Sequence, residues 1–164
     1  SNGPNEVRYY NGADTCLVEE YNNSGNMVER CYGGSDVRAL SGAGGWVTSV
    51  PELARFVASI DGRPEIPDII SAQSVADMTQ WFDEQTYSLG WNDTKPTGEW
   101  TRTGTLSGTS ALIKYYPDGE CWIMVTNTST WKGPGFTRQT AALFRDLRSR
   151  YSSVLPARNL FHAR

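Results

Sequence analysis

Three short runs of β-favouring residues, separated by turn signals, dominate the stretch from Glu99 to Ser129. The runs are Trp100–Thr105, Thr109–Tyr116 and Cys121–Thr128, with Leu106-Ser107-Gly108 and Pro117-Asp118-Gly119 between them. This pattern predicts a three-stranded antiparallel meander. Residues 111–113 and 122–125 are apolar at successive positions, which is typical of strands covered on both faces. We therefore expect a central sheet with helices packed on it.

The strongest helix signal begins at Ser49. Ser49 and Glu52 form a capping-box pair, Pro51 lies in the first turn and Gly62 gives a stop. The apolar residues of this segment fall on one helical face and predict an amphipathic helix that serves as scaffold: Val50, Leu53, Ala54, Phe56, Val57 and Ile60.

Two further segments have helical periodicity. Ser71–Trp81 places Val75, Met78 and Trp81 or Phe82 at helical spacing. Phe136–Val154 is predicted to bury a stripe made of Thr140, Leu143, Phe144, Leu147 and Tyr151. Its arginines lie mostly off that stripe and indicate a solvated face: Arg138, Arg145, Arg148 and Arg150. Residues 157–164 have no periodicity and are interpreted as a tail or docking segment.

The N-terminal part has a weaker β pattern. Glu6–Tyr10 is rich in strand formers, and the Asn/Ser/Gly cluster at 22–26 predicts a hairpin between Cys16–Tyr21 and Met27–Tyr32. Glu and Arg side chains keep one face of this hairpin wet, so we expect it at the periphery. The whole chain is thus predicted to be α+β, with an antiparallel sheet (the meander plus this hairpin) packed with about three helices.

Length and charge limit the classes of function. With 164 residues and 38% hydrophobic content, the chain is long enough for one domain with a sizeable core, or for a fragment spanning 1–164. A net charge of -3 and a pI near 5.2, without a basic run, argue against nucleic-acid binding. No apolar run approaches the roughly 20 residues of a transmembrane helix, and the first residues lack signal-peptide organisation.

Cysteine and histidine usage indicates neither a metal site nor a cofactor. Cys16, Cys31 and Cys121 have no C-x-x-C spacing, and His162 is the single histidine. The cysteines are interpreted as buried thiols, or alternatively Cys16 and Cys31 are bridged across the hairpin in an oxidising compartment. Three N-x-[ST] sequences begin at Asn22, Asn92 and Asn127. The glycine-rich segment 41–46 lacks the G-x-G-x-x-G spacing of a nucleotide-binding loop.

The first run of the meander contains Arg102-Thr103-Gly104-Thr105. A cation and a hydroxyl precede a glycine that lets a ligand approach the backbone, which suits an anionic or carbonyl-bearing ligand. The alternative is that Arg102 is a solvated strand residue and Thr103 merely a good strand former. The pattern resembles the third signature motif of the penicillin-recognising serine hydrolases: β-lactamases of class C type, DD-peptidases and related esterases. In that family a Lys or His, a Thr or Ser and a Gly line one edge of the active site.

Two other blocks carry the same resemblance in the expected order: GAGGWVTSVPELARF at 42–56, similar to the glycine-rich turn and following helix, and YSLGW at 87–91, similar to the segment before the motif strand. The resemblance implies part of a β-lactamase/transpeptidase-like fold and hydrolysis of an amide or ester through an acyl-enzyme. It implies that the Thr105 N–H belongs to an oxyanion hole, that Thr103 and Gly104 contact substrate, and that Arg102 supplies positive potential. Arg in place of Lys or His cannot shuttle a proton.

The nucleophile of that family, a Ser with a Lys one helical turn later, has no counterpart at the expected place. Ser129 and Lys132 have the spacing, but Gly133-Pro134 follows at once, so we do not expect Lys132 in a helix. Tyr9-Tyr10-Asn11 and Tyr21-Asn22-Asn23 match the family's Tyr motif by chance, in hairpin sequence, and His162 is a solvated residue of the tail.

Two interpretations therefore stay open. Either the chain is the C-terminal portion of a periplasmic or extracellular serine hydrolase acting on a β-lactam, D-Ala peptide or ester, or it is a non-catalytic binding module that keeps the sheet. The first interpretation implies that this chain lacks elements that complete the fold in the family. We then expect the chain to self-associate through the unpaired strand edge at 121–128 and through an uncovered sheet face presented by Ile113 and Tyr115.

Overall fold

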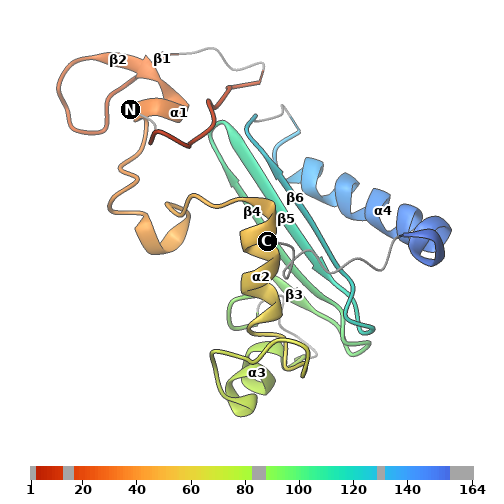
Figure 1. Cartoon of the computed structure of the whole chain (residues 1–164). Helices are drawn as coiled ribbons and strands as arrows, with labels where there is room; N and C mark the ends of the chain where they lie inside the picture. The colour runs from red at the N-terminus through yellow and green to blue at the C-terminus, as the bar shows by residue number, and fades with distance from the viewer. Residues whose placement is uncertain (1–2, 13–16, 83–87, 129–131, 156–164) are drawn as a thin grey trace.

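The computed structural model describes residues 3–12, 17–82, 88–128 and 132–155, and its fold is α+β as the sequence predicts (Figure 1). Within these residues the strands form a two-stranded sheet, β1-β2, and a four-stranded sheet in the order β3-β4-β5-β6. All strand pairs of both sheets are antiparallel. The larger sheet is the centre of the molecule.

The predicted meander is confirmed as β4 (Trp100–Leu106), β5 (Thr109–Tyr115) and β6 (Cys121–Thr126). The two connecting turns need left-handed backbone, which glycine adopts without strain: φ is +79° at Gly108 and +93° at Gly119. The sequence pattern alone did not predict β3 (Asp93–Thr94), which adds a short pair to β4.

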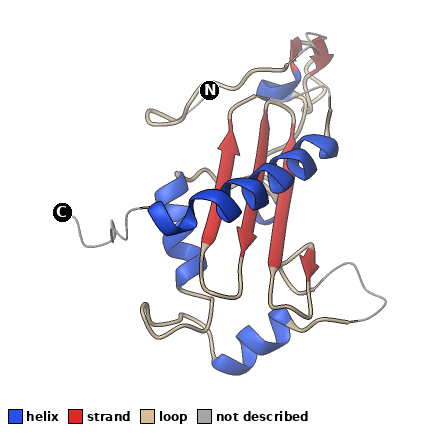
Figure 2. Cartoon of the chain, turned by 90° about the vertical axis from the view of Figure 1, so that its right-hand side faces the viewer, coloured by secondary structure: helices blue, strands red, loops and turns tan. Residues whose placement is uncertain are grey.

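Both faces of this sheet are covered, as the continuous apolar runs predict. α2 (Val50–Ala58) lies over one face, and α4 (Pro134–Tyr151) crosses the other (Figures 1 and 2). Under α2 the buried cluster consists of Val57, Trp91, Ile113 and Tyr115, with Leu53, Trp100, Cys121 and Ile123 packed against it. The expectation that Ile113 and Tyr115 present an uncovered face is therefore wrong, because 9% and 3% of these residues are exposed.

The helix starts follow their sequence signals. The Ser49–Glu52 capping box is present in both directions, and in α3 (Ala72–Thr79) the hydroxyl of Ser71 accepts the N–H of Ser74. The predicted apolar face of α2 is only partly correct. Val57 is buried, but Val50, the first residue of the helix, and Phe56 are 40% and 46% exposed.

The stripe predicted for the last helix is also partly wrong. α4 begins at Pro134 and continues into the 3-10 helix η2 (Ser152–Val154), and Phe144 packs on Trp122 of β6 at a ring-centroid distance of 5.5 Å. Leu143 and Tyr151 are 51% and 48% exposed rather than buried. Arg148, predicted to be a solvated residue, instead faces the sheet, because it lies one turn after Phe144 on the same side of the helix.

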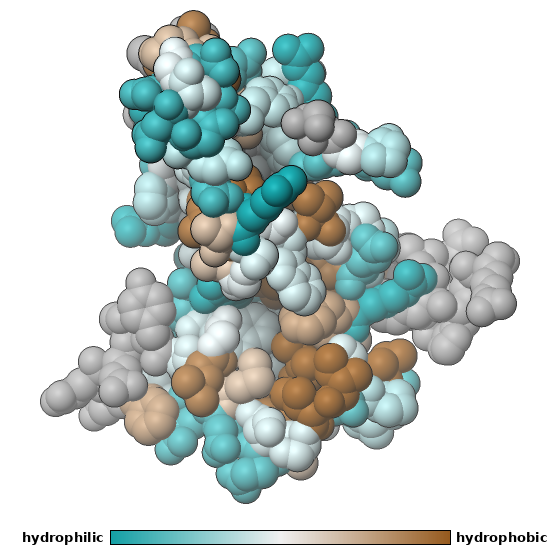
Figure 3. All heavy atoms as spheres, turned by 90° about the vertical axis from the view of Figure 1, so that its left-hand side faces the viewer, coloured by the Kyte–Doolittle hydropathy of each residue, from teal (hydrophilic) through white to brown (hydrophobic). Residues whose placement is uncertain are grey.

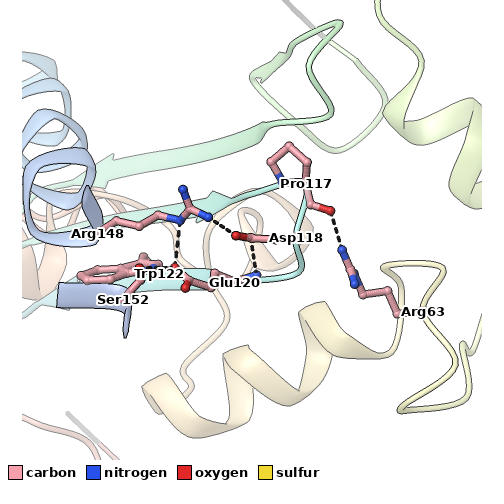
Figure 4. Close-up of polar contacts among 7 residues, drawn as sticks. All are labelled: Arg63, Pro117, Asp118, Glu120, Trp122, Arg148 and Ser152. Atoms are coloured by element: carbon pink, nitrogen blue, oxygen red, sulfur yellow. Dashed lines mark hydrogen bonds and ion pairs between the residues drawn. The ribbon is translucent and has the colours of Figure 1, made fainter. Parts of the chain in front are cut away.

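Two arginines hold the turn between β5 and β6 (Figure 4). The Arg63 guanidinium donates to the carbonyl oxygen of Pro117, and a side chain at Gly119 would collide with it. Arg148 pairs with Asp118 and, at 2.8 Å, with Glu120, and its guanidinium lies 4.3 Å from the centre of the Tyr116 ring. The turn is thus fixed from the loop after α2 and from α4 at once.

The N-terminal hairpin is confirmed but shorter than predicted. It consists of β1 (Leu17–Glu19) and β2 (Met27–Glu29), and the chain then turns into the short helix α1 (Arg30–Gly33) instead of staying extended to Tyr32. The 3-10 helix η1 (Ser41–Ala43) follows. Residues 6–10 form no strand, only a single parallel bridge between Tyr10 and Thr128, because the N–H of Tyr9 is bound by the Tyr32 hydroxyl.

The predicted Cys16–Cys31 bridge lies outside the described residues, since Cys16 does. The thiol of Cys31 is free, 3.8 Å from a carboxylate oxygen of Glu29. In the part of the chain that is described, no helix has the length and apolar character needed to span a bilayer. On the α2 side of the molecule, hydrophobic surface is exposed in several separate groups (Figure 3).

Candidate functional site

The candidate site is the outer edge of β4, the strand that carries Arg102-Thr103-Gly104-Thr105. Along its inner side β4 pairs with β5 from Trp100 to Leu106. On its outer side it pairs with β3 at two positions only, Trp100 and Thr101. Beyond Thr101 the outer edge has no strand beside it in the part of the chain that the structure describes.

The direction of each backbone group on this edge follows from its hydrogen bonds. The carbonyl oxygen of Thr101 accepts the N–H of Asn92 at 2.9 Å, and the N–H of Thr103 donates to the side-chain oxygen of Asn92. Both groups therefore point outward. Because alternate residues of an antiparallel strand direct their backbone groups to the same side, the N–H of Thr105 points outward as well.

This N–H of Thr105 is the next donor along the edge, and no hydrogen-bond partner for it occurs among the described residues. Thr105 itself is exposed. An outward N–H on a fixed strand is the kind of donor that stabilises a carbonyl oxygen as it gains negative charge. The register thus leaves the N–H of Thr105 facing outward at the exposed edge.

The side chains of the motif divide between the two faces. Arg102 and Gly104 lie on the face of Trp100, toward α2, and Thr103 and Thr105 lie on the opposite face. Arg102 is exposed, and within the described residues it forms no ion pair. It therefore contributes an uncompensated positive charge about 7 Å along the strand from Gly104.

Gly104 is not required by the packing of the chain itself. Apart from its two chain neighbours, no atom of the described residues lies within 4 Å of the position where a side chain on Gly104 would begin, and its φ is not positive. A glycine weakens a strand interior unless something approaches the backbone closely. The open space over Gly104 is therefore available to a ligand lying against the strand.

The glycine-rich segment lies at the far end of this edge. A side chain on Gly44 would come within 3.2 Å of the Leu106 side chain, so the turn at 41–45 lies beside the end of β4. The segment forms only the three-residue η1, and α2 begins five residues after Gly45. It therefore lacks the loop-to-helix geometry of a phosphate-binding loop.

Asn92 is the functional candidate that sequence reasoning missed. Its side-chain oxygen accepts both the N–H and, at 3.3 Å, the hydroxyl of Thr103, so it fixes the backbone next to Thr105. In the sequence Asn92 appeared only as the start of an N-x-[ST] match. Its position directly after YSLGW, where the chain turns into β3, was the available signal.

The rejected nucleophile and Tyr matches can be placed in part. Lys132 precedes α4 and binds the Gln139 side chain at 2.7 Å, so it is not one helical turn from Ser129 on a common helix, as predicted. Ser129 and His162 lie outside the described residues. Tyr9 and Tyr21 lie outside any helix, as predicted, but in irregular segments rather than in strands. Among the described residues there is no group of three or more side chains suited to hold a metal ion.

No family model, curated protein or solved structure matches this chain.

Proposed function

We propose that this chain binds a carboxylate- or carbonyl-bearing ligand along the outer edge of β4, as the C-terminal portion of a penicillin-recognising serine hydrolase. The reaction class is acyl transfer from an amide or ester, as in a β-lactamase, a D-Ala-D-Ala carboxypeptidase or a related esterase. Thr105 donates its N–H to the reacting carbonyl oxygen, Thr103 and Gly104 form the surface that the ligand lies on, and Arg102 attracts its carboxylate.

One observation carries this proposal: the outward N–H of Thr105 without a partner in the described chain, next to an uncovered glycine and an exposed arginine. A strand edge that only completed a sheet would not need this combination. The donor is fixed before the ligand arrives, because Asn92 and β5 hold the strand on either side of it. Preorganised donors of this kind are the largest single contribution to many acyl transfers.

Arg102 acts by its charge alone. A guanidinium stays protonated at all working pH values, so it does not remove a proton from a nucleophile. The serine that forms the acyl-enzyme and its general base would come from residues other than those described around this edge. The three lysines of the chain have other partners: Lys95 binds Asp93, Lys114 binds Glu99 and Lys132 binds Gln139.

The second candidate function is a non-catalytic module that binds the same ligand class. The arginine at position 102 favours it, because a binding site needs the positive charge but not the proton transfer that Lys or His would allow. The two candidates share the ligand and differ in the chemical step. Formation of a covalent adduct distinguishes them.

The test is an NMR titration of the chain with an N-acetylated peptide ending in D-Ala-D-Ala and with the same peptide as its C-terminal amide. We expect the acid to shift the amide resonances of Gly104 and Thr105 and the amide peptide to bind more weakly. Arg102→Ala should weaken binding of the acid roughly threefold or more, the effect of one exposed ion pair. Arg138→Ala removes an exposed arginine from α4 and is the matched control.

Resonance shifts confined to residues outside β4 would overturn the proposed site. Equal weakening by Arg102→Ala and Arg138→Ala would show that the ligand responds only to net charge. Equal binding of the acid and the amide would remove the carboxylate from the proposal.

A further inference from the structure

The outer edge of β6 is a second exposed edge of the sheet, at the opposite end from β4. No strand pairs with it from Cys121 to Thr126 in the part of the chain that the structure describes. On one face of β6, Cys121 and Ile123 pack against the cluster under α2, and on the other face Trp122 packs on Phe144 of α4. Apart from Val125, which is 39% exposed, the residues of β6 are at least partly buried, so what this edge mainly leaves unsatisfied is backbone.

The unpaired backbone groups can be assigned. The N–H of Tyr116 donates to the carbonyl oxygen of Glu120, so Glu120 and every second residue after it bond inward to β5. The groups of Cys121, Ile123 and Val125 therefore point outward. The next outward carbonyl, on Asn127, agrees with this assignment, because it accepts the N–H of Tyr10 at 3.0 Å.

This edge lacks the usual protection against strand addition. Natural proteins block edges with charged side chains, prolines or bulges, and the sequence CWIMVT of β6 has none of these. It pairs with β5 residue for residue, without a bulge. Three consecutive outward donor–acceptor pairs are thus presented to a neighbouring strand.

The length available for pairing is fixed at both ends. At its start the chain turns away through Pro117 to Glu120, held there by Arg63 and Arg148 (Figure 4). At its end Tyr10 occupies the edge at Asn127. Only residues 121–125 are open, and the centre of this window is Ile123.

We propose that this window pairs with the same window of a second copy of the chain, antiparallel and about a two-fold axis at Ile123. Ile123 then lies opposite Ile123, and Cys121 lies opposite Val125. On the other face Trp122 lies opposite Met124. Every opposed pair is apolar, so the window is complementary to itself. A two-fold contact of this kind is closed, because the β6 edge of each copy is used up by the other.

Residues of opposite charge also come together at the two ends of the window in this arrangement. The two-fold axis brings Asn127 of one copy opposite the turn that contains Asp118 and Glu120 of the other. Arg8 is exposed and lies beside Asn127, whose side-chain amide donates to the Arg8 carbonyl oxygen at 2.8 Å. In the proposed dimer, the segment that carries Arg8 of one copy therefore lies beside the turn whose two carboxylates share Arg148 in the other copy, at both ends of the interface. The Arg8 guanidinium lies 5.7 Å from the centre of the Tyr10 ring, at the same end of the window.

The product is one continuous antiparallel sheet with β6 of each copy at its centre. Both β4 edges stay at the outside, so the pairing leaves the candidate ligand site open. A peptide partner of unrelated sequence would satisfy the same backbone groups, but it would not reproduce the matched ends. The second copy is therefore the occupant that the window fits.

The first test is the oligomeric state by sedimentation over a range of micromolar concentrations. We expect a dimer that dissociates on dilution. Val125→Lys places a charge in the window at a position that is 39% exposed, and Val125→Pro removes an outward N–H that β5 does not use. Each should raise the dimer dissociation constant roughly tenfold or more, because both copies carry the change.

Two controls separate pairing from folding and from net charge. Val125→Thr keeps a β-branched residue without charge and should preserve the dimer. Leu143→Lys adds the same charge at an exposed apolar position of α4 and should also preserve it. A chain that is monomeric at every concentration, or a Val125→Lys variant as dimeric as the parent, overturns the proposal.

Hydrogen exchange gives a test that needs no variant. In the dimer the amides of Cys121, Ile123 and Val125 should be protected along with those of Trp122, Met124 and Thr126. On dilution to monomer the first three should exchange rapidly while the second three stay protected by β5. Protection of all six in the monomer would show that the chain completes its own edge, and the proposal would be wrong.

Discussion

The side chain of Asn92 binds the outer edge of β4 at Thr103, just beyond the last residue of β4 that pairs with β3. Its oxygen accepts the Thr103 N–H and hydroxyl at the point where the pairing of β3 with β4 ends. The last outward amide that the described chain satisfies is thus that of Thr103, and the first that it leaves exposed is that of Thr105. This one contact sets the boundary between scaffold and candidate site.

Asn92→Ala should destabilise the chain and loosen β4. The substitution leaves a half-buried N–H without its partner, which costs about 1 kcal/mol of the free energy of unfolding at a site that water reaches in part. Thr103→Val is the matched control, because it removes only the hydroxyl contact and keeps the backbone bond. Urea denaturation measures both. An equal effect of the two variants would show that the hydroxyl, not the backbone N–H, is what Asn92 serves.

Stability should fall at high pH through two buried groups under α2. Burial raises the pKa of Tyr115 to about 12, aided by the neighbouring Asp61 carboxylate, and burial likewise raises the pKa of the Cys121 thiol to about 12. The folded chain therefore holds these protons more tightly than the unfolded chain, whose pKa values are about 10 and 8.5. Their contribution is complete below those values and is lost as pH rises toward 12.

The measurement is the free energy of unfolding between pH 8 and pH 12 for the parent chain and Tyr115→Phe. The variant loses the hydrogen bonds of the hydroxyl to Asp61 and Arg63, at 3.0 and 2.8 Å, so it is less stable at neutral pH. Its stability should also fall less steeply above pH 10. Tyr21→Phe, at an exposed position, should follow the parent, and a parallel decline for all three would contradict the assignment.

Arg148→Ala should cost more stability than Arg150→Ala on the same helix. Arg148 joins Asp118, Glu120 and the ring of Tyr116, and its side chain is 29% exposed, so we expect a loss on the order of 1 kcal/mol. Among the described residues Arg150 pairs only with Asp146, and both side chains are at least half exposed, which predicts a loss below about 0.5 kcal/mol. Thermal or urea unfolding compares them, and a larger loss for Arg150→Ala would refute the role given to Arg148.

The isolated chain should form no covalent adduct with a fluorescent penicillin. Lys132 lies before α4 rather than on it, so it is not the helical lysine that a Ser-x-x-Lys nucleophile needs. Intact-mass measurement after incubation with the penicillin is the check, with a known penicillin-binding enzyme as positive control. A stoichiometric adduct would revive a nucleophile within this chain, and its peptide map would identify the serine.

The sequence by itself determined the elements whose signals are local. Alternation and turn glycines located β4, β5 and β6, and the Ser49–Glu52 pair located the start of α2, because each signal acts through contacts a few residues apart. Continuous apolar runs also predicted that helices cover both faces of the sheet. The same local signals placed the motif at Arg102–Thr105 on a strand.

Tertiary structure alone decided which positions of those elements meet and which stay open. Val50, Phe56 and Leu143 are apolar and periodic, yet they are exposed, because burial depends on what each position of a helix meets after packing. Asn92 reaches Thr103 only once β3 has folded back on β4, and the windows at Thr105 and at 121–125 exist only because no described strand lies beside them. The two windows depend on backbone groups that every residue carries, so the side-chain pattern along the chain does not encode them.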